Sequence, residues 1–129
     1  MTINEYQKRA YTNIKPHTDF KDEALDYSIG LCEETGEVMN HIKHKFWGSE
    51  SIDRNKFAKE IGDVLWYLSA LCTLFNLDLE AIAKLNIEKL EYRFKDGYSI
   101  ENSKARHFSD DQFENTNEYK ELIKNINEI

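Results

Sequence analysis

Apolar residues recur at helical spacing along most of the chain and divide it into amphipathic segments. Residues 3 to 14 predict a short helix, which the stretch around Pro16 ends. A longer helix is predicted from about Asp19–Lys21, where a cap is available, to about Lys45. Its apolar positions are Leu25, Ile29, Cys32, Met39, Ile42 and Phe46. An adjoining stripe of the same segment holds Tyr27, Gly30, Glu34, Glu37 and His41.

Two further helices follow after a loop predicted at residues 47–51. Ser51 or Asp53 is expected to cap the first of them, which runs to about Phe75 and has the strongest periodicity in the chain. Its apolar stripe is Phe57, Ile61, Val64, Leu65, Leu68, Leu71, Cys72 and Phe75. Asp78 is expected to cap the next helix, which ends at Asp96-Gly97.

The remainder of the chain is more polar. Residues 98–117 contain few apolar side chains and are predicted to form a loop, followed by a last helix near Glu114 to Asn127. Short links between four main helices predict an all-α fold, with an antiparallel four-helix bundle-like core. The expected organisation is a domain of residues 1–107 and a C-terminal extension of residues 108–129 with a short helix.

Length and charge narrow the range of functions. The chain has 129 residues, 40% of them hydrophobic, which suits one domain with a single core. A net charge of −7 argues against a nucleic-acid partner. No apolar run of membrane-spanning length and no leader is recognised, so we expect a cytoplasmic protein with no membrane partner. Cys32 and Cys72 both fall on apolar stripes and are expected to be reduced thiols in the core.

One acidic pattern occurs twice, and each copy lies in a predicted helix. Glu34-Thr-Gly-Glu37-Val and Glu60-Ile-Gly-Asp63-Val share the form E-x-G-[ED]-V. Residues three apart lie on one helix face, so each copy pairs two carboxylates, and four would converge if the helices pack together. Four carboxylates in a partly dry site repel one another unless a cation is present. Oxygen ligands alone favour a hard ion, Mg²⁺ or Mn²⁺.

The glycines inside the two copies add to this prediction. Gly36 and Gly62 stand in the middle of helices, where glycine costs about 1 kcal/mol relative to alanine. We expect them to permit close approach of a backbone, a metal ion or a phosphate.

Three segments in order resemble the MazG-like, all-alpha nucleoside triphosphate pyrophosphohydrolases. Glu33-Glu34-Thr-Gly-Glu37 followed by Glu60-Ile-Gly-Asp63 is similar to their E-E-x-x-E … E-x-x-D signature, and the segment from Asn86 to Arg93 also resembles the family. The likeness covers roughly residues 5 to 107. It implies Mg²⁺-dependent hydrolysis of a nucleoside or deoxynucleoside triphosphate to the monophosphate and pyrophosphate, in the house-cleaning of nucleotide pools.

The resemblance also assigns roles to residues. It implies metal ligation by Glu34, Glu37, Glu60 and Asp63, and phosphate contacts from Asn86, Lys89 and Arg93. Glu33 or Glu37 is the expected acceptor of the proton of the attacking water. Trp47 is a candidate for stacking on the base, with an ordinary packed side chain as the alternative.

Other readings of these residues remain open. Lys89 and Arg93 could form ion pairs with Glu88 or Glu91 on their own helix. A di-iron carboxylate bundle would need Glu-x-x-His, which is not found in the sequence. A catalytically silent nucleotide-binding or helical interaction module is the main alternative function. The four histidines do not form a zinc set, although His41 could stand close to the acidic site.

The predicted helix that ends near Phe75 is apolar around most of its circumference, because it also carries Trp66, Tyr67 and Leu74. Such a helix must be buried on more than one side. We therefore expect a homodimer or homotetramer, with Trp66 either in the core or at the subunit interface.

Overall fold

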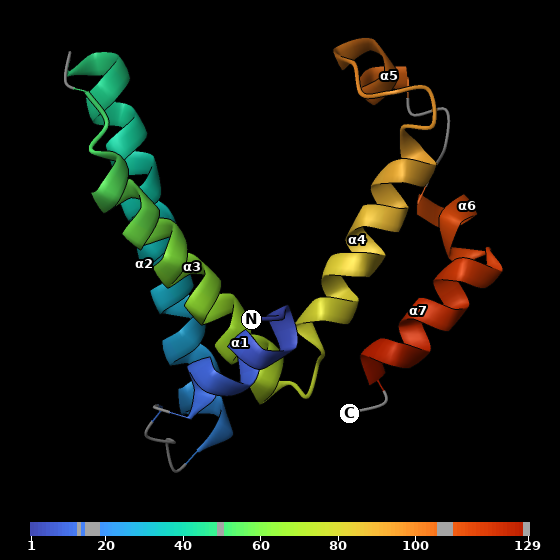
Figure 1. Ribbon diagram of the computed structural model, residues 1–129, viewed down its shortest axis with the longest axis horizontal. Helices are drawn as coiled ribbons and strands as arrows, with labels where there is room; N and C mark the ends of the chain where they lie inside the picture. Colours follow the sequence, from blue (N-terminus) through green and yellow to red (C-terminus); the bar gives the residue numbers. More distant parts are fainter. Residues whose placement is uncertain (13, 15–18, 49–50, 106–109, 128–129) are drawn as a thin grey trace. The chain divides into compact units, whose positions relative to one another are not determined.

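The computed structural model describes residues 1–12, 14, 19–48, 51–105 and 110–127, and these contain helices and no strand (Figure 1). The predicted all-α class is therefore confirmed for the described residues. In chain order the helices are α1 (Ile3–Tyr11), α2 (Phe20–Trp47), α3 (Arg54–Leu74), α4 (Leu79–Arg93), α5 (Ile100–Ala105), α6 (Asp110–Glu114) and α7 (Asn117–Asn127). No helix in these ranges has the length and apolar character needed to cross a membrane.

The chain forms two compact units, Met1–Phe75 and Asn76–Ile129. The division falls well before the domain boundary expected at residue 107, which stays a prediction. The first unit contains α1 to α3, and the second contains α4 to α7. A four-helix bundle core also stays a prediction.

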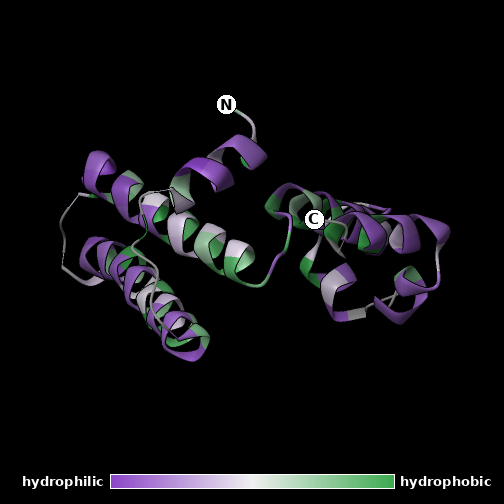
Figure 2. Cartoon of the chain, turned by 90° about the horizontal axis from the view of Figure 1, so that it is seen from below, coloured by the Kyte–Doolittle hydropathy of each residue, from purple (hydrophilic) through white to green (hydrophobic). Residues whose placement is uncertain are grey.

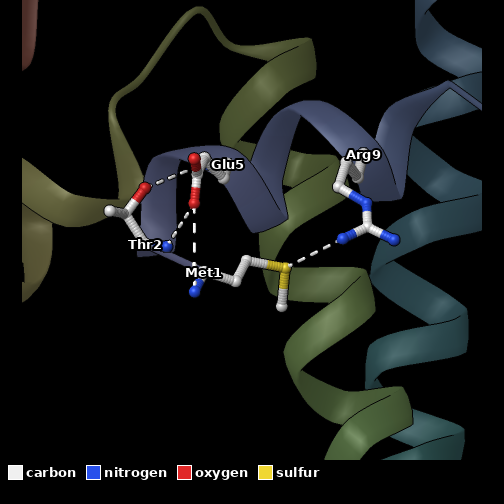
Figure 3. Close-up of polar contacts among 4 residues, drawn as sticks. All are labelled: Met1, Thr2, Glu5 and Arg9. Carbon is white, nitrogen blue, oxygen red and sulfur yellow. Dashed lines mark hydrogen bonds and ion pairs between the residues drawn. The ribbon is translucent and has the colours of Figure 1, made fainter.

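Helix α1 begins at a complete capping box (Figure 3). The Thr2 hydroxyl oxygen accepts a hydrogen bond from the Glu5 backbone N–H at 3.1 Å, and the Glu5 carboxylate accepts one from the Thr2 N–H at 2.7 Å. These bonds satisfy donors that the first turn of a helix leaves unpaired. The helix ends at Tyr11, three residues earlier than predicted, and Pro16 lies outside the described residues.

Helices α2 and α3 lie side by side in the first unit (Figure 1). Asp19 caps α2, and Asp53 caps α3 by accepting hydrogen bonds from the N–H groups of Asn55 and Lys56. These backbone bonds lower the pKa of the Asp53 carboxyl. A cap was predicted near Asp19, and Asp53 was one of two predicted caps, with Ser51 as the alternative. The loop prediction was wrong at Trp47, which is the last residue of α2.

The face of α2 that packs inward is not its apolar stripe. Leu25, Ile29, Met39 and Phe46 are between 50% and 72% exposed, and Cys32 is exposed as well. The buried residues are Glu23, Tyr27 and Gly30, and Glu34 and His41 are half-buried further along the same line. The prediction that Cys32 is a core thiol was therefore wrong, and most of the apolar stripe of α2 lies outside the core of the first unit. Figure 2 shows hydrophobic and hydrophilic residues side by side along these helices.

Helix α3 behaves in the same way. Its buried residues are Ser69, Ala70 and Cys72, whereas the predicted core positions Ile61, Leu65, Leu68 and Phe75 are exposed. Cys72 is thus a buried free thiol, as expected. Trp66 is half-buried, with its ring centroid 6.2 Å from that of Tyr27 and 4.9 Å from that of Tyr67.

A buried carboxylate joins α1 to α2. Glu23 is only 6% exposed, and its Oε1 accepts hydrogen bonds from the hydroxyls of Tyr27 at 2.6 Å and Tyr11 at 3.2 Å. Burial is the first cause of the raised pKa of both tyrosines, and the bond to Glu23 adds to it. One turn before Tyr11 on α1, the Gln7 side chain donates a hydrogen bond to the hydroxyl of Thr73 on α3. Polar bonds thus anchor α1 to both long helices.

The second unit corrects the prediction of a loop over residues 98–117. Helices α5 and α6 occupy part of this range, and α7 begins at Asn117, three residues later than predicted. Ser99 accepts the Asn102 N–H at 2.9 Å and so starts α5, a local signal that the low apolar content had hidden. Phe113 of α6 is 4% exposed, with its ring centroid 5.6 Å from those of both Tyr92 and Tyr119. One aromatic residue therefore holds α6 between α4 and α7.

Candidate metal centre

Three carboxylates meet where α2 packs on α3. Glu34 lies on the inward line of α2 that also carries Tyr27 and Gly30, and Glu60 and Asp63 lie one turn apart on α3. One oxygen from each of the three carboxylates lies within 4.8 Å of the others. The spacing predicted from the two acidic motifs thus brings together three of the four expected ligands.

The charges in this cluster oppose one another. Burial first, and then the charges of Asp63 and Glu60, raise the pKa of the Glu34 carboxyl above its ordinary value. A carboxyl that resists ionisation beside two others is the electrostatic condition that a bound cation relieves. Because every donor atom is a carboxylate oxygen, the set fits Mg²⁺ or Mn²⁺ better than a soft metal.

The two remaining acids of the first motif stand outside this group of three. Glu33 and Glu37 are exposed on α2, and both add to the raised pKa of Glu34 through their charge. They are therefore near enough to act electrostatically on Glu34, with side chains directed to solvent. The roles predicted for them, proton acceptor for Glu33 or Glu37 and metal ligand for Glu37, stay predictions.

A histidine and two tyrosines border the acidic cluster. The Nε2 atom of His41 lies 3.8 Å from an oxygen of Glu60, an ion pair whenever the imidazole is protonated. Burial raises the pKa of the Tyr67 hydroxyl, and the negative charge of Glu34 adds to this effect. The pKa of the Tyr6 hydroxyl is raised by burial and, to a smaller extent, by the charge of Asp63. Tyr67 follows Asp63 by four residues, so helix spacing alone predicts that the two side chains share a face of α3. Tyr6 comes from α1, which no local signal linked to the site.

Among the glycines within α2 and α3, Gly30 has a close neighbour and the two motif glycines, Gly36 and Gly62, have none. A Cβ atom built on Gly30 would lie 2.3 Å from two ring carbons of Tyr67. At Gly36 and Gly62 no atom of the described residues would come within 4 Å of such a Cβ. The expected close approach of a backbone to the motif glycines is therefore not found there.

The predicted substrate residues of α4 lie in the second unit. Asn86 and Lys89 line a cavity of 320 Å³ formed with α6 and α7. Arg93 pairs with Asp110, seventeen residues further along the chain, instead of with an acid of its own helix. The alternative prediction, an ion pair of Arg93 with Glu88 or Glu91, was therefore wrong.

Trp47 is 82% exposed at the end of α2. Trp47 is therefore not packed against other described residues, and the alternative of an ordinary packed tryptophan was wrong. Its stacking on a base stays a prediction.

Comparison with known proteins identifies the part of the chain that carries this geometry. The family model of the MazG nucleotide pyrophosphohydrolase domain matches residues 23–98. The Gene 37 protein of Mycobacterium phage L5 is 31% identical over 76 residues, which cover 55% of this chain and 67% of that protein. No solved structure matches. The matched range contains the acidic cluster and the polar line of α4, which consists of Asn86, Lys89 and Arg93. It ends before α5.

Proposed function

This chain belongs to the MazG nucleotide pyrophosphohydrolase domain family, and from that premise we propose that it is a metal-dependent hydrolase of a nucleoside or deoxynucleoside triphosphate. The products are the nucleoside monophosphate and pyrophosphate. The cellular role that fits this reaction is the house-cleaning of nucleotide pools. The observation that carries the proposal is the meeting of three carboxylates from the two motif helices within 4.8 Å.

Glu34, Glu60 and Asp63 would hold Mg²⁺ or Mn²⁺, with Glu37 completing the ligand set from the same helix as Glu34. The raised pKa of Glu34 supports this, because ligation by an ion would relieve the repulsion that opposes its ionisation. When bound, the ion would offset the charge of the triphosphate and lower the pKa of a bound water.

The proton of the attacking water needs an acceptor that the ion does not fully engage. Glu33 and Glu37 are exposed on the helix that also carries Glu34, and either carboxylate could accept this proton. The neighbouring His41 contacts Glu60 and would hold that carboxylate in position.

The leaving pyrophosphate would be met by the polar line on α4. Lys89 and Arg93 supply positive charge, and Asn86 supplies amide donors. Arg93 keeps further N–H donors when one of them is engaged by Asp110. Trp47 is the candidate for stacking against the base, since its indole is open to solvent.

A pyrophosphate-release assay across the common ribonucleotides and deoxyribonucleotides tests the proposal. We expect turnover with Mg²⁺ or Mn²⁺ and none with Zn²⁺ or excess chelator. Glu37→Gln and Asp63→Asn should each abolish turnover and keep the helical circular dichroism signal. Glu121→Gln makes the same charge change at an exposed residue that pairs with Lys124, and it should leave turnover unchanged. Hydrolysis in excess chelator would refute the metal-dependent mechanism.

We also propose that the chain assembles as a homodimer or homotetramer. The support is the exposure of apolar residues on two helices, Ile61, Leu65 and Leu68 on α3 and the apolar positions of α2 named above. Light scattering at micromolar concentration should give at least twice the chain mass of 15.3 kDa. A stable, active monomer would contradict this assembly.

A further inference from the structure

The last two helices form one wall of a cavity, and they lie outside the range that the family match covers. Asp110 of α6 pairs with Arg93 of α4, and the buried Phe113 packs between the rings of Tyr92 and Tyr119. An ion pair at one end and an aromatic cluster at the other thus fix α6 against α4. A cavity walled in this way is preformed.

The cavity measures 320 Å³ and combines three kinds of lining. Two aliphatic side chains of α4 and the rings of Phe113 and Tyr119 supply apolar and aromatic surface. Asn86 and Lys89 of α4 supply donors for an anion, and Glu114 of α6 supplies a carboxylate. The volume is near the lower limit of the roughly 300–1,000 Å³ of ligand pockets, so it suits a base with its sugar better than a whole triphosphate.

We propose that this cavity binds the nucleoside part of the substrate and that Glu114 selects bases with an exocyclic amino group. The inference rests on the proposed function, because it takes Asn86 and Lys89 as the residues that meet the phosphates. Because Lys89 itself lines the cavity, a nucleotide with a phosphate at Lys89 can reach the rest of the cavity with its sugar and base. The half-buried ring of Tyr119 provides the stacking surface that a base prefers and is the alternative to Trp47 for this role.

The choice between amino and keto bases follows from hydrogen-bond chemistry. Asp110 is engaged by Arg93, whereas Glu114 has no ion-pair partner among the described residues. An ionised carboxylate only accepts hydrogen bonds. It therefore binds the amino group of cytosine or adenine and repels the keto oxygen that uracil or hypoxanthine carries at the same place. The extension thus provides base selectivity from outside the range that the family model matches.

Matched substrate pairs test this selectivity with the full chain. We expect kcat/KM for CTP over UTP, and for ATP over ITP, to be about tenfold or more, since each pair differs in the group that meets Glu114. Glu114→Gln should bring both ratios within about twofold, because an amide both donates and accepts. Glu121→Gln, the same charge change on α7, should leave them unaltered. Ratios near one in the wild type, or ratios that Glu114→Gln does not change, would overturn the inference.

A binding experiment without metal separates this inference from the proposed hydrolysis. Cytidine and uridine carry no phosphate, so their binding in chelator, followed by NMR titration, depends on the cavity and not on the acidic cluster. We expect cytidine to bind more tightly than uridine in the wild type and in Glu121→Gln, and the difference to vanish in Glu114→Gln. Equal binding of the two nucleosides to the wild type would refute the cavity assignment, even if hydrolysis is observed. Failure of hydrolysis with this difference intact would refute the proposed function alone.

Discussion

Replacing Gly30 with alanine should destabilise the first unit, although alanine is the better helix former. A Cβ atom at residue 30 would lie 2.3 Å from two ring carbons of Tyr67 and 2.7 Å from its hydroxyl oxygen. Both residues lie in the packed interface of α2 and α3, so either the ring or a helix must move. Overpacking of this kind costs about 1–3 kcal/mol. The gain in helix propensity offsets about 1 kcal/mol, which leaves a net loss of about 0–2 kcal/mol.

The matched control is Gly36→Ala on the same helix, where a Cβ atom would meet no described atom within 4 Å. This variant should gain about 1 kcal/mol from helix propensity alone. The two variants should therefore differ by about 1–3 kcal/mol in the free energy of unfolding, measured by urea denaturation with circular dichroism. Gly62→Ala on α3, also in open space, should behave like Gly36→Ala.

A double-mutant cycle identifies the cause. Tyr67→Leu removes the ring atoms that the new Cβ would meet, so Gly30→Ala should cost less in that background than in the wild type. If Gly30→Ala is as stabilising as Gly36→Ala, the close packing of α2 on Tyr67 is not present in solution. The carboxylate cluster, which depends on the same interface, would then have to be reconsidered.

Three further predictions follow from buried groups. Tyr27→Phe removes the 2.6 Å hydrogen bond to the buried Glu23 carboxylate and should lower the free energy of unfolding by about 1–3 kcal/mol. Tyr11→Phe removes a longer bond of 3.2 Å to the same carboxylate and should cost less. Equal losses for the two variants in urea denaturation would contradict this order. A thiol reagent should modify the exposed Cys32 in the folded protein and the buried Cys72 only after unfolding. Peptide mass mapping identifies the labelled cysteine, and rapid labelling of both would be inconsistent with the packing of α3. Burial and then Asp63 and Glu60 raise the pKa of Glu34, so the folded metal-free protein holds this proton more tightly than the unfolded chain and loses stability as pH rises through the raised pKa. Relative to wild type, Glu34→Gln should therefore gain stability in chelator as pH rises above the ordinary glutamate pKa of about 4, and a pH-independent difference would count against the raised pKa.

Local signals in the sequence determined the main helices. The acid caps at Asp19, Asp53 and Asp78 were predicted because a side chain caps the N–H groups of the next few residues, an interaction that needs no tertiary partner. The acidic motifs predicted a paired arrangement for a similar reason, since residues three apart share a helix face. Helices α5 and α6 were missed because they are short and carry few apolar residues, and the burial of Phe113 by α4 and α7 is a long-range event.

The tertiary structure decided which helix faces are buried. Periodicity in α2 and α3 identified the apolar stripes, but the residues that pack inward are Tyr27 and Gly30 on α2 and Ser69 and Ala70 on α3. Small residues allow the helix backbones to approach, and Tyr67 occupies the space that the missing Gly30 side chain leaves. Glu34 follows on the inward line of α2 and so meets Glu60 and Asp63, whereas Glu37 is exposed and stands outside this group of three. Sequence spacing determines which residues share a face, but only contact between helices determines what that face meets.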